Sequence, residues 1–184
     1  SYGSVTNEAG GTIRGVTAVD VTSGGTIVNR GTIVGDVAGY QYSYGSTIYV
    51  ADGGTLTGNL RFGAGNDTLV LFGDDSGISG TIDGGAGTNT LVHARRESGT
   101  VTLGAIALTN FGAEGVRALG LETQVTVRAE APFTGDLSLS GDGAIVNTAS
   151  IAGMVRANAF YQNDPTTIDL VDALAFTNEA TIEG

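Results

Sequence analysis

The stretch Asn29-Arg-Gly-Thr-Ile-Val-Gly35 decides how this chain folds, because its pattern occurs four times. Related stretches cover residues 7–15, 147–153 and 178–184, and the first of these carries two extra residues. The shared core is Asn, a small residue, Thr or Ser, Ile, any residue and Gly. Glycine permits turns with positive φ, while Thr and Ile favour extended backbone. Each copy therefore predicts a turn followed by a short strand.

A second repeat gives the period of the chain. Residues 63–70 read Gly-Ala-Gly-Asn-Asp-Thr-Leu-Val, and residues 85–92 read Gly-Ala-Gly-Thr-Asn-Thr-Leu-Val. The offset between these copies equals the offset between Asn7 and Asn29. A period of roughly 22 residues, built from strands and turns, is typical of a β-solenoid, so 184 residues predict roughly eight coils. Equivalent Asn side chains of successive coils are expected to form a hydrogen-bonded ladder.

The segments between these repeats also have the pattern of strands and turns. Residues 15–23 alternate apolar and small polar side chains, which is the period of a half-buried strand. Residues 100–103 and 124–128 are short runs rich in Val and Thr, and they predict two more strands. Residues 110–116 lie between these runs and are expected to form a turn.

No linker or change of composition divides the chain, so we expect a single solenoid domain over residues 1–184. Loop excursions are expected near residues 38–46 and 157–166, where the repeat is interrupted. The bare repeat stands near both termini, without a capping helix. Because an uncapped coil is an open sheet edge, we expect either a segment of a longer solenoid or a unit that associates end to end into a fibre.

The composition narrows the classes of partner. The chain has a formal net charge of −11, and its eight basic residues are all Arg. Such an acidic chain has little with which to neutralise phosphates, so no nucleic-acid partner is expected. There is no Cys for a disulfide or a thiolate metal site. No apolar run approaches the roughly 20 residues of a membrane-spanning helix, so we expect no membrane insertion of this segment.

The sequence resembles the passenger domains of autotransporters, the type V secreted surface proteins of Gram-negative bacteria. The resemblance rests on the Asn-x-Gly-Thr-Ile-x-Gly repeats, on residues 53–60 and 80–92, and on the turn at residues 108–111. It implies a right-handed parallel β-helix that is displayed outside the cell as a stalk or adhesin. The implied location is the extracellular space or the cell surface of a Gram-negative bacterium.

Residues 63–69 also resemble the calcium-binding nonapeptide of RTX proteins, Gly-Gly-x-Gly-x-Asp-x-Leu-x. The Asp67 carboxylate and turn carbonyls would supply the oxygen ligands that Ca²⁺ prefers. However, Phe62 replaces the first Gly, Asn89 replaces the Asp in the second copy, and the two copies are one full period apart rather than in tandem. We therefore expect a structural turn and no cofactor, with an RTX-like calcium-binding solenoid as the alternative.

The candidates for catalysis are His93, which is the only His, and the acids Asp74, Asp75 and Asp83. Nucleophilic catalysis needs His beside a nucleophile and an acid, and glycoside hydrolysis needs two carboxyl groups at a set separation. His93 ends a predicted strand and is expected at the surface, while Asp74 and Asp75 flank a glycine turn. We expect no enzymatic activity, with a β-helical polysaccharide-processing enzyme as the alternative.

The candidate interaction surface is aromatic, since aromatic side chains on protruding loops are typical anchors of contacts. Its members are Tyr40, Tyr42, Tyr44, Tyr49, Phe160 and Tyr161. They predict binding to a host or bacterial surface glycan, to another protein or to the next protomer. In the alternative interpretation they fold back onto the solenoid wall. The sequence as a whole predicts a structural protein, either an adhesin stalk or a self-assembling fibre subunit.

Overall fold

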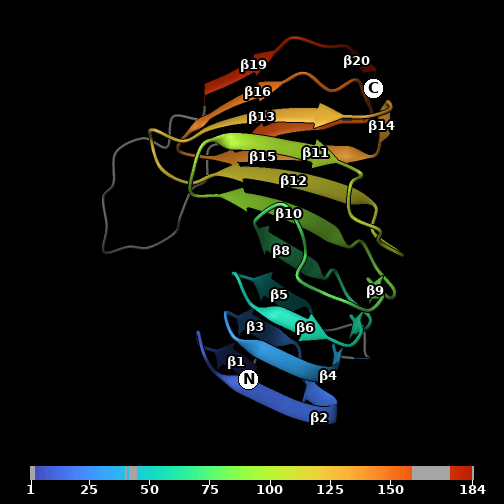
Figure 1. Ribbon diagram of the computed structural model, residues 1–184. Helices are drawn as coiled ribbons and strands as arrows, with labels where there is room; N and C mark the ends of the chain where they lie inside the picture. The colour runs from blue at the N-terminus through green and yellow to red at the C-terminus, as the bar shows by residue number, and fades with distance from the viewer. Residues whose placement is uncertain (1–2, 40, 42–44, 159–174, 184) are drawn as a thin grey trace, which may run out of the picture. The chain divides into compact units, whose positions relative to one another are not determined.

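The chain forms an all-β parallel β-solenoid of about seven coils, as the computed structural model shows (Figure 1). The structure describes residues 3–39, 41, 45–158 and 175–183, and these ranges contain no helix. The backbone divides into two compact units. Unit 1 comprises residues 1–93 and 106–113, and unit 2 comprises residues 94–105 and 114–184. The predicted all-β solenoid is confirmed, while the single domain over residues 1–184 stays a prediction.

Unit 1 is built from two ladders of parallel strands, which follow one another from blue to green in Figure 1. The first ladder contains β1 (Gly3–Asn7), β3 (Gly25–Asn29), β5 (Thr47–Ala51), β8 (Thr68–Phe72) and β10 (Thr90–Arg95). The second contains β2 (Thr12–Asp20), β4 (Thr32–Ala38), β6 (Thr55–Thr57), β7 (Leu60–Arg61) and β9 (Ile82–Asp83). Gly3 pairs with Gly25 and Gly25 pairs with Thr47, so the predicted period of about 22 residues is confirmed here.

Unit 2 is built from three ladders of parallel strands. The first contains β11 (Gly99–Leu103), β13 (Gln124–Ala129), β16 (Ala144–Asn147) and β19 (Ala175–Asn178). The second contains β14 (Phe133–Thr134), β17 (Ile151–Ala152) and β20 (Ile182–Glu183). The third contains β12 (Ala113–Ala118), β15 (Asp136–Gly141) and β18 (Val155–Asn158).

The coils of unit 2 differ in length. Along the β11–β13–β16–β19 ladder, Ser98 meets Gln124 at a spacing of 26 residues, and Asn147 meets Asn178 at a spacing of 31 residues. Between β15 and β18, Asp136 meets Met154 at a spacing of only 18 residues. Coil length in unit 2 therefore departs from a uniform period of about 22 residues, and the whole chain forms about seven coils rather than the roughly eight that such a period predicts.

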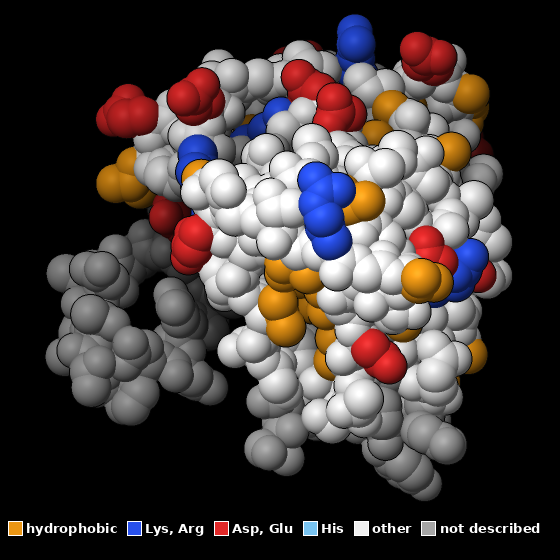
Figure 2. Space-filling model, turned by 60° about the horizontal axis from the view of Figure 1, so that its bottom comes forward, with side chains coloured by type: hydrophobic (Ala, Val, Ile, Leu, Met, Phe, Trp, Pro, Cys, Tyr) orange, Lys and Arg blue, Asp and Glu red, His pale blue; other side chains and the backbone are white. Residues whose placement is uncertain are grey.

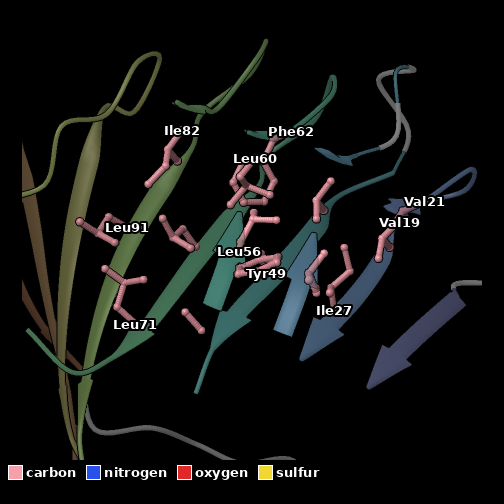
Figure 3. Close-up of a cluster of buried hydrophobic side chains, with 14 residues drawn as sticks. Val19, Val21, Ile27, Tyr49, Leu56, Leu60, Phe62, Leu71, Ile82 and Leu91 are labelled. Carbon is pink, nitrogen blue, oxygen red and sulfur yellow. The ribbon is translucent and has the colours of Figure 1, made fainter. Parts of the chain in front are cut away.

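The core of each unit follows from the alternation of side chains along the strands. β3 and β8 bury every second residue, because successive side chains of a strand point to opposite faces. Figure 3 shows the core of unit 1, where Ile27, Leu56, Leu71 and Leu91 point inward from different coils. Burial of one such side chain contributes about 1.5–3 kcal/mol. Unit 2 has its own core of Val101, Leu103, Val116, Ala118, Val125, Val127, Leu137, Leu139, Ile145, Ala149 and Ile151.

Gly35 illustrates why glycine recurs in the repeat. Its φ is 122°, in a region that side chains with a Cβ rarely adopt. A Cβ at this position would also collide with the carbonyl oxygen of Gly15 in the neighbouring strand β2. The two coils approach too closely at this point for any residue other than glycine.

One local prediction is wrong, and two lie outside the described residues. The turn predicted over residues 110–116 is confined to the region of Asn110, whose φ is 60°, and β12 begins at Ala113. The sequence does not predict this strand, because Glu114 and Gly115 are buried together with Val116 and apolar and polar residues do not alternate. The excursions expected near residues 38–46 and 157–166 fall mainly on residues 40, 42–44 and 159–174, outside the described ranges.

Candidate functional site

A buried column of polar side chains joins three coils of unit 1 at the beginning of β5, β8 and β10. Thr47, Asp67 and Asn89 form this column, and each is at most 1% exposed. The Thr47 N–H donates to Asp67 Oδ1 at 2.6 Å, and the Asp67 N–H donates to Asn89 Oδ1 at 2.9 Å. Asn89 Nδ2 donates in turn to the carbonyl oxygen of Asn110 at 2.9 Å. Asp67 and Asn89 thus each cap the backbone of the preceding coil.

Asp67 differs from its neighbours because it brings a carboxyl group into this column. Its Oδ2 is buried and has no hydrogen-bond partner. Burial raises the pKa of Asp67, and hydrogen bonds from the backbone of Thr47 and Gly63 oppose that rise. Sequence reasoning missed the column, although the exchange of Asp67 for Asn89 at equivalent positions is a signal. The position immediately before β8 or β10 requires an acceptor oxygen, which both side chains supply.

The same geometry bears on the calcium alternative. One oxygen of Asp67 and the oxygen of Asn89 accept backbone N–H groups inside the solenoid. Among the described residues, no group of three or more His, Cys, Asp or Glu side chains could hold a metal ion. The arrangement of residues 63–69 therefore favours the structural turn, and calcium binding stays an untested alternative.

The Asn residues of the opening repeat form the predicted ladder, in two short pieces. In unit 1, Asn7 Nδ2 donates to Asn29 Oδ1 at 2.9 Å, and both side chains are buried. In unit 2, Asn147 Nδ2 donates to Asn178 Oδ1 at 2.8 Å. The first ladder ends at Tyr49, whose hydroxyl accepts from Asn29 Nδ2 at 3.2 Å. The ladder prediction is confirmed for these pairs, which fix the register between neighbouring coils.

A second set of contacts between coils lies at the surface of unit 1. Glu8, Arg30 and Asp52 follow one another at a spacing of 22 residues. Arg30 binds Glu8 Oε2 through Nη1 at 3.2 Å and Asp52 Oδ2 through Nε at 2.9 Å. The hydrogen bonds that Arg30 donates to Asp52 and Glu8 raise the pKa of Arg30. This charged column follows the same period as the buried columns.

Asp36 and Asn59 continue this cross-coil bonding on the second ladder of unit 1. The Asn59 N–H donates to Asp36 Oδ1 at 2.9 Å, and Arg61 forms an ion pair with Asp36 Oδ2. Hydrogen bonds from Asn59 and Arg61 lower the pKa of Asp36. Asn59 Oδ1 in turn accepts from the N–H of Thr81 at 3.0 Å. These polar side chains are again engaged by the next coil.

The acids that could mimic a hydrolase are held in local structure. Asp83 Oδ1 accepts from the Gly85 N–H at 2.9 Å and from Asn110 Nδ2 at 2.7 Å. These hydrogen bonds lower the pKa of Asp83, which disfavours the protonated form that a general acid needs. Asp75 Oδ1 accepts from the Gly77 N–H at 2.9 Å, as expected for a turn. Asp74, beside it, is exposed.

His93 does not lie at the surface, so the prediction for its position is wrong. It is 4% exposed and belongs to β10. Leu91, two residues earlier, is fully buried, and residues two apart on a strand share a face. His93 is therefore buried because it occupies an inward position in the alternation of the strand, although its ring is polar.

Of the six aromatic residues of the candidate interaction surface, only Tyr49 is among the described residues. Tyr49 is 1% exposed in the core of unit 1 (Figure 3), so its assignment to an exposed surface is wrong. It alternates inward in β5, and burial raises the pKa of its hydroxyl to about 12. The others lie outside the described ranges, and their role stays a prediction: Tyr40, Tyr42, Tyr44, Phe160 and Tyr161.

Unit 2 contains a cavity of about 570 Å³, between residues 102–105 and 130–134. Leu103 and Phe133 give it apolar walls, and Glu130 contributes a carboxyl group. Gly104, at the end of β11, has a φ of 70° and donates its N–H to Glu114 Oε1 at 2.9 Å. The cavity therefore lies where the chain turns out of the β11–β13 ladder.

The face that Figure 2 displays consists mostly of backbone and of side chains that are neither hydrophobic nor charged, and charge is not concentrated on it.

No helix in the described part of the chain is long and apolar enough to cross a membrane. No family model matches the chain, and the searches of curated proteins and of solved structures find no match.

Proposed function

We propose that this chain is a non-enzymatic structural part of a cell-surface or extracellular protein of a Gram-negative bacterium, similar to an autotransporter passenger. It acts as an adhesin stalk or as the subunit of a self-assembling fibre. The observation that carries the proposal is the set of polar columns in register. Polar side chains in these columns bind a neighbouring coil: Asn29 binds Asn7, Arg30 binds Glu8, and Asn59 binds Thr81.

Columns of this kind favour a role as a mechanical support or a spacer. Each coil holds its neighbour through backbone hydrogen bonds, buried amides and ion pairs, so that the resistance to unfolding is distributed along the chain. A coil that presents the same donors and acceptors as its neighbour can accept another coil in the same register. This is the physical basis for the end-to-end association that the proposal includes.

The proposal assigns recognition to the aromatic residues of the two interrupted segments. Tyr40, Tyr42, Tyr44, Phe160 and Tyr161 would contact a host or bacterial surface glycan or protein, and this part rests on the sequence alone. Tyr49 is excluded from this surface because it belongs to the core.

The test uses the purified chain in electron microscopy and in sedimentation at increasing protein concentration. Filaments, or association that increases with concentration, support the fibre subunit. Protease-resistant monomers support the stalk. Rapid degradation by protease of both the associated and the monomeric chain would contradict a structural role.

A separate assay measures turnover of acidic polysaccharides. We expect no turnover by the wild-type chain. Turnover that is lost in Asp83→Ala and kept in the control Asp136→Ala would replace the structural proposal with an enzymatic one.

A further inference from the structure

The second ladder of unit 2 begins with a strand that has one neighbour. β14 pairs with β17 and stands first in the order β14-β17-β20. Continuing the β11–β13 register, in which Leu103 pairs with Ala129, would place Ala107 and Leu108 opposite Phe133 and Thr134. The chain instead leaves this ladder after Gly104, and Leu108 packs against the core of unit 1. Within the described strands, one edge of β14 thus stays open.

The hydrogen bonds of β14 show which groups this edge presents. The Phe133 N–H donates to the Ser150 carbonyl at 2.9 Å, and the Gly135 N–H donates to the Ala152 carbonyl at 3.3 Å. Successive residues of a strand direct their N–H and C=O groups to opposite sides. The N–H and C=O of Thr134 therefore point away from β17, towards the open edge. An open edge of this kind is a template for another strand.

The cavity of unit 2 borders this edge and adds side-chain pockets to it. Its volume of about 570 Å³ is within the range of sites that hold small ligands or short segments. Leu103 is 4% exposed and Phe133 is half-buried, so the walls can receive an apolar side chain. Glu130 is an exposed acid in the lining. Arg128, two residues earlier, donates from Nε to Thr102 Oγ1 at 2.9 Å and does not line the cavity.

We propose that this edge binds an extended, basic peptide segment of a partner protein, which adds a strand to β14. The Thr134 N–H and C=O bracket one residue of the peptide, as neighbouring strands do in a parallel ladder. An apolar side chain of the peptide enters the cavity beside Leu103 and Phe133. A Lys or Arg of the peptide faces Glu130, in a chain whose net charge of −11 attracts basic segments.

A peptide fits this site better than a glycan because Thr134 offers a donor and an acceptor in the spacing of a β-ladder. Pro132, also in the lining, has no N–H, so it shortens the edge and confines the pairing to Thr134. The binding is therefore short and depends on the side chains of the peptide. This inference goes beyond the proposed structural role and does not depend on it.

The test follows the amide resonances of the full ¹⁵N-labelled chain by NMR while the acetylated and amidated peptide Lys-Val-Thr-Val-Lys is added. We expect a shift of the Thr134 amide and slower hydrogen exchange at that position. Methylation of the peptide nitrogen of the residue that follows the bracketed one should weaken binding at least tenfold, because in a parallel ladder that N–H donates to the Thr134 carbonyl. No change at Thr134, or equal binding of the methylated peptide, would overturn the proposal.

Variants separate the strand pairing from simple charge attraction. Thr134→Pro removes the edge donor and should lower the affinity for the peptide at least tenfold. Glu130→Gln should lower it several-fold, while Glu122→Gln, which removes an exposed acid outside the cavity, should leave it unchanged. An equal loss in both Gln variants would mean non-specific attraction to the acidic chain and would overturn the assigned site.

Discussion

Replacement of Asp67 by Asn tests the interpretation of the buried polar column. The side chain is 1% exposed, and Oδ2 has no hydrogen-bond partner. The amide of Asn keeps the oxygen that accepts the Thr47 N–H at 2.6 Å. Asn89 shows that an amide fits the equivalent position one coil later. Asn removes the buried negative charge, whose desolvation is unfavourable, so we expect Asp67→Asn to raise the free energy of unfolding at neutral pH by about 1–2 kcal/mol.

The pH dependence of this gain is the sharper measurement. Burial raises the pKa of Asp67 above its ordinary value of 3.8, so the folded chain holds this proton more tightly than the unfolded chain. Ionised Asp67 lowers the free energy of unfolding. This loss of stability is absent below pH 3.8, grows as the pH rises towards the folded-state pKa, and is complete above that pKa. The gain from Asp67→Asn should therefore be largest at neutral pH and should shrink as the pH approaches 4.

The assay is thermal unfolding of both proteins, followed by circular dichroism from about pH 4 to about pH 8. For a chain of this size, 1 kcal/mol corresponds to about 2–4 °C in the melting temperature. Asp75→Asn is the matched control, because it removes the same charge from an exposed turn and keeps an acceptor for Gly77. The reasoning is refuted if Asp67→Asn changes the melting temperature by the same amount at every pH, or if it lowers it at neutral pH.

Three further outcomes are expected. Asn29→Ala should lower the free energy of unfolding by about 1–3 kcal/mol in urea titrations, because Asn7 and the Tyr49 hydroxyl lose a buried partner; no loss would contradict the role of the ladder. Gly35→Ala should cost more than about 1 kcal/mol, whereas Gly99→Ala, with open space around it, should change stability by less than about 0.5 kcal/mol, and similar costs would count against close coil approach. The lowered pKa of Asp83 stabilises the fold above pH 3.8, and this contribution is lost as the pH falls through the folded-state pKa. Denaturation midpoints measured below pH 4 should consequently fall less steeply in the Asp83→Asn variant than in the wild-type chain, and identical slopes would exclude this assignment.

The architecture of unit 1 could be predicted because its information is periodic. Gly3, Gly25 and Thr47 follow the period that the repeats display, and Asn7 meets Asn29 as the ladder predicts. A parallel solenoid places equivalent positions on top of one another, so a sequence period translates directly into strand pairing. The long coils of unit 2 break this relation, and the period cannot predict a pairing such as that of Ala144 with Ala175.

Side-chain roles could be predicted less well, because residue type is a weaker guide than position in a strand. Tyr49 and His93 are polar or amphipathic, yet both occupy inward positions and are buried. Asp67 resembles a metal ligand by its motif, but it faces a backbone N–H of the preceding coil. In each case the surroundings of the side chain depend on its inward or outward position in the strand or on the neighbouring coil. The residue type alone reveals neither. Sequence motifs in a solenoid should therefore be assigned to an inward or an outward column before any chemistry is considered.

The equal spacing of β1, β3 and β5 in unit 1 also has a consequence for how such a gene can change in length. Because Gly3 pairs with Gly25 and Gly25 with Thr47, an in-frame duplication of one whole period adds a coil whose strands meet partners in the register that they had before. The added coil brings its own asparagine and its own buried aliphatic residues. Unequal recombination between neighbouring repeats can thus lengthen or shorten this part of the protein by whole coils without creating an unmatched strand. In unit 2, where the spacing differs from one pair of strands to the next, the same event would misalign the ladders.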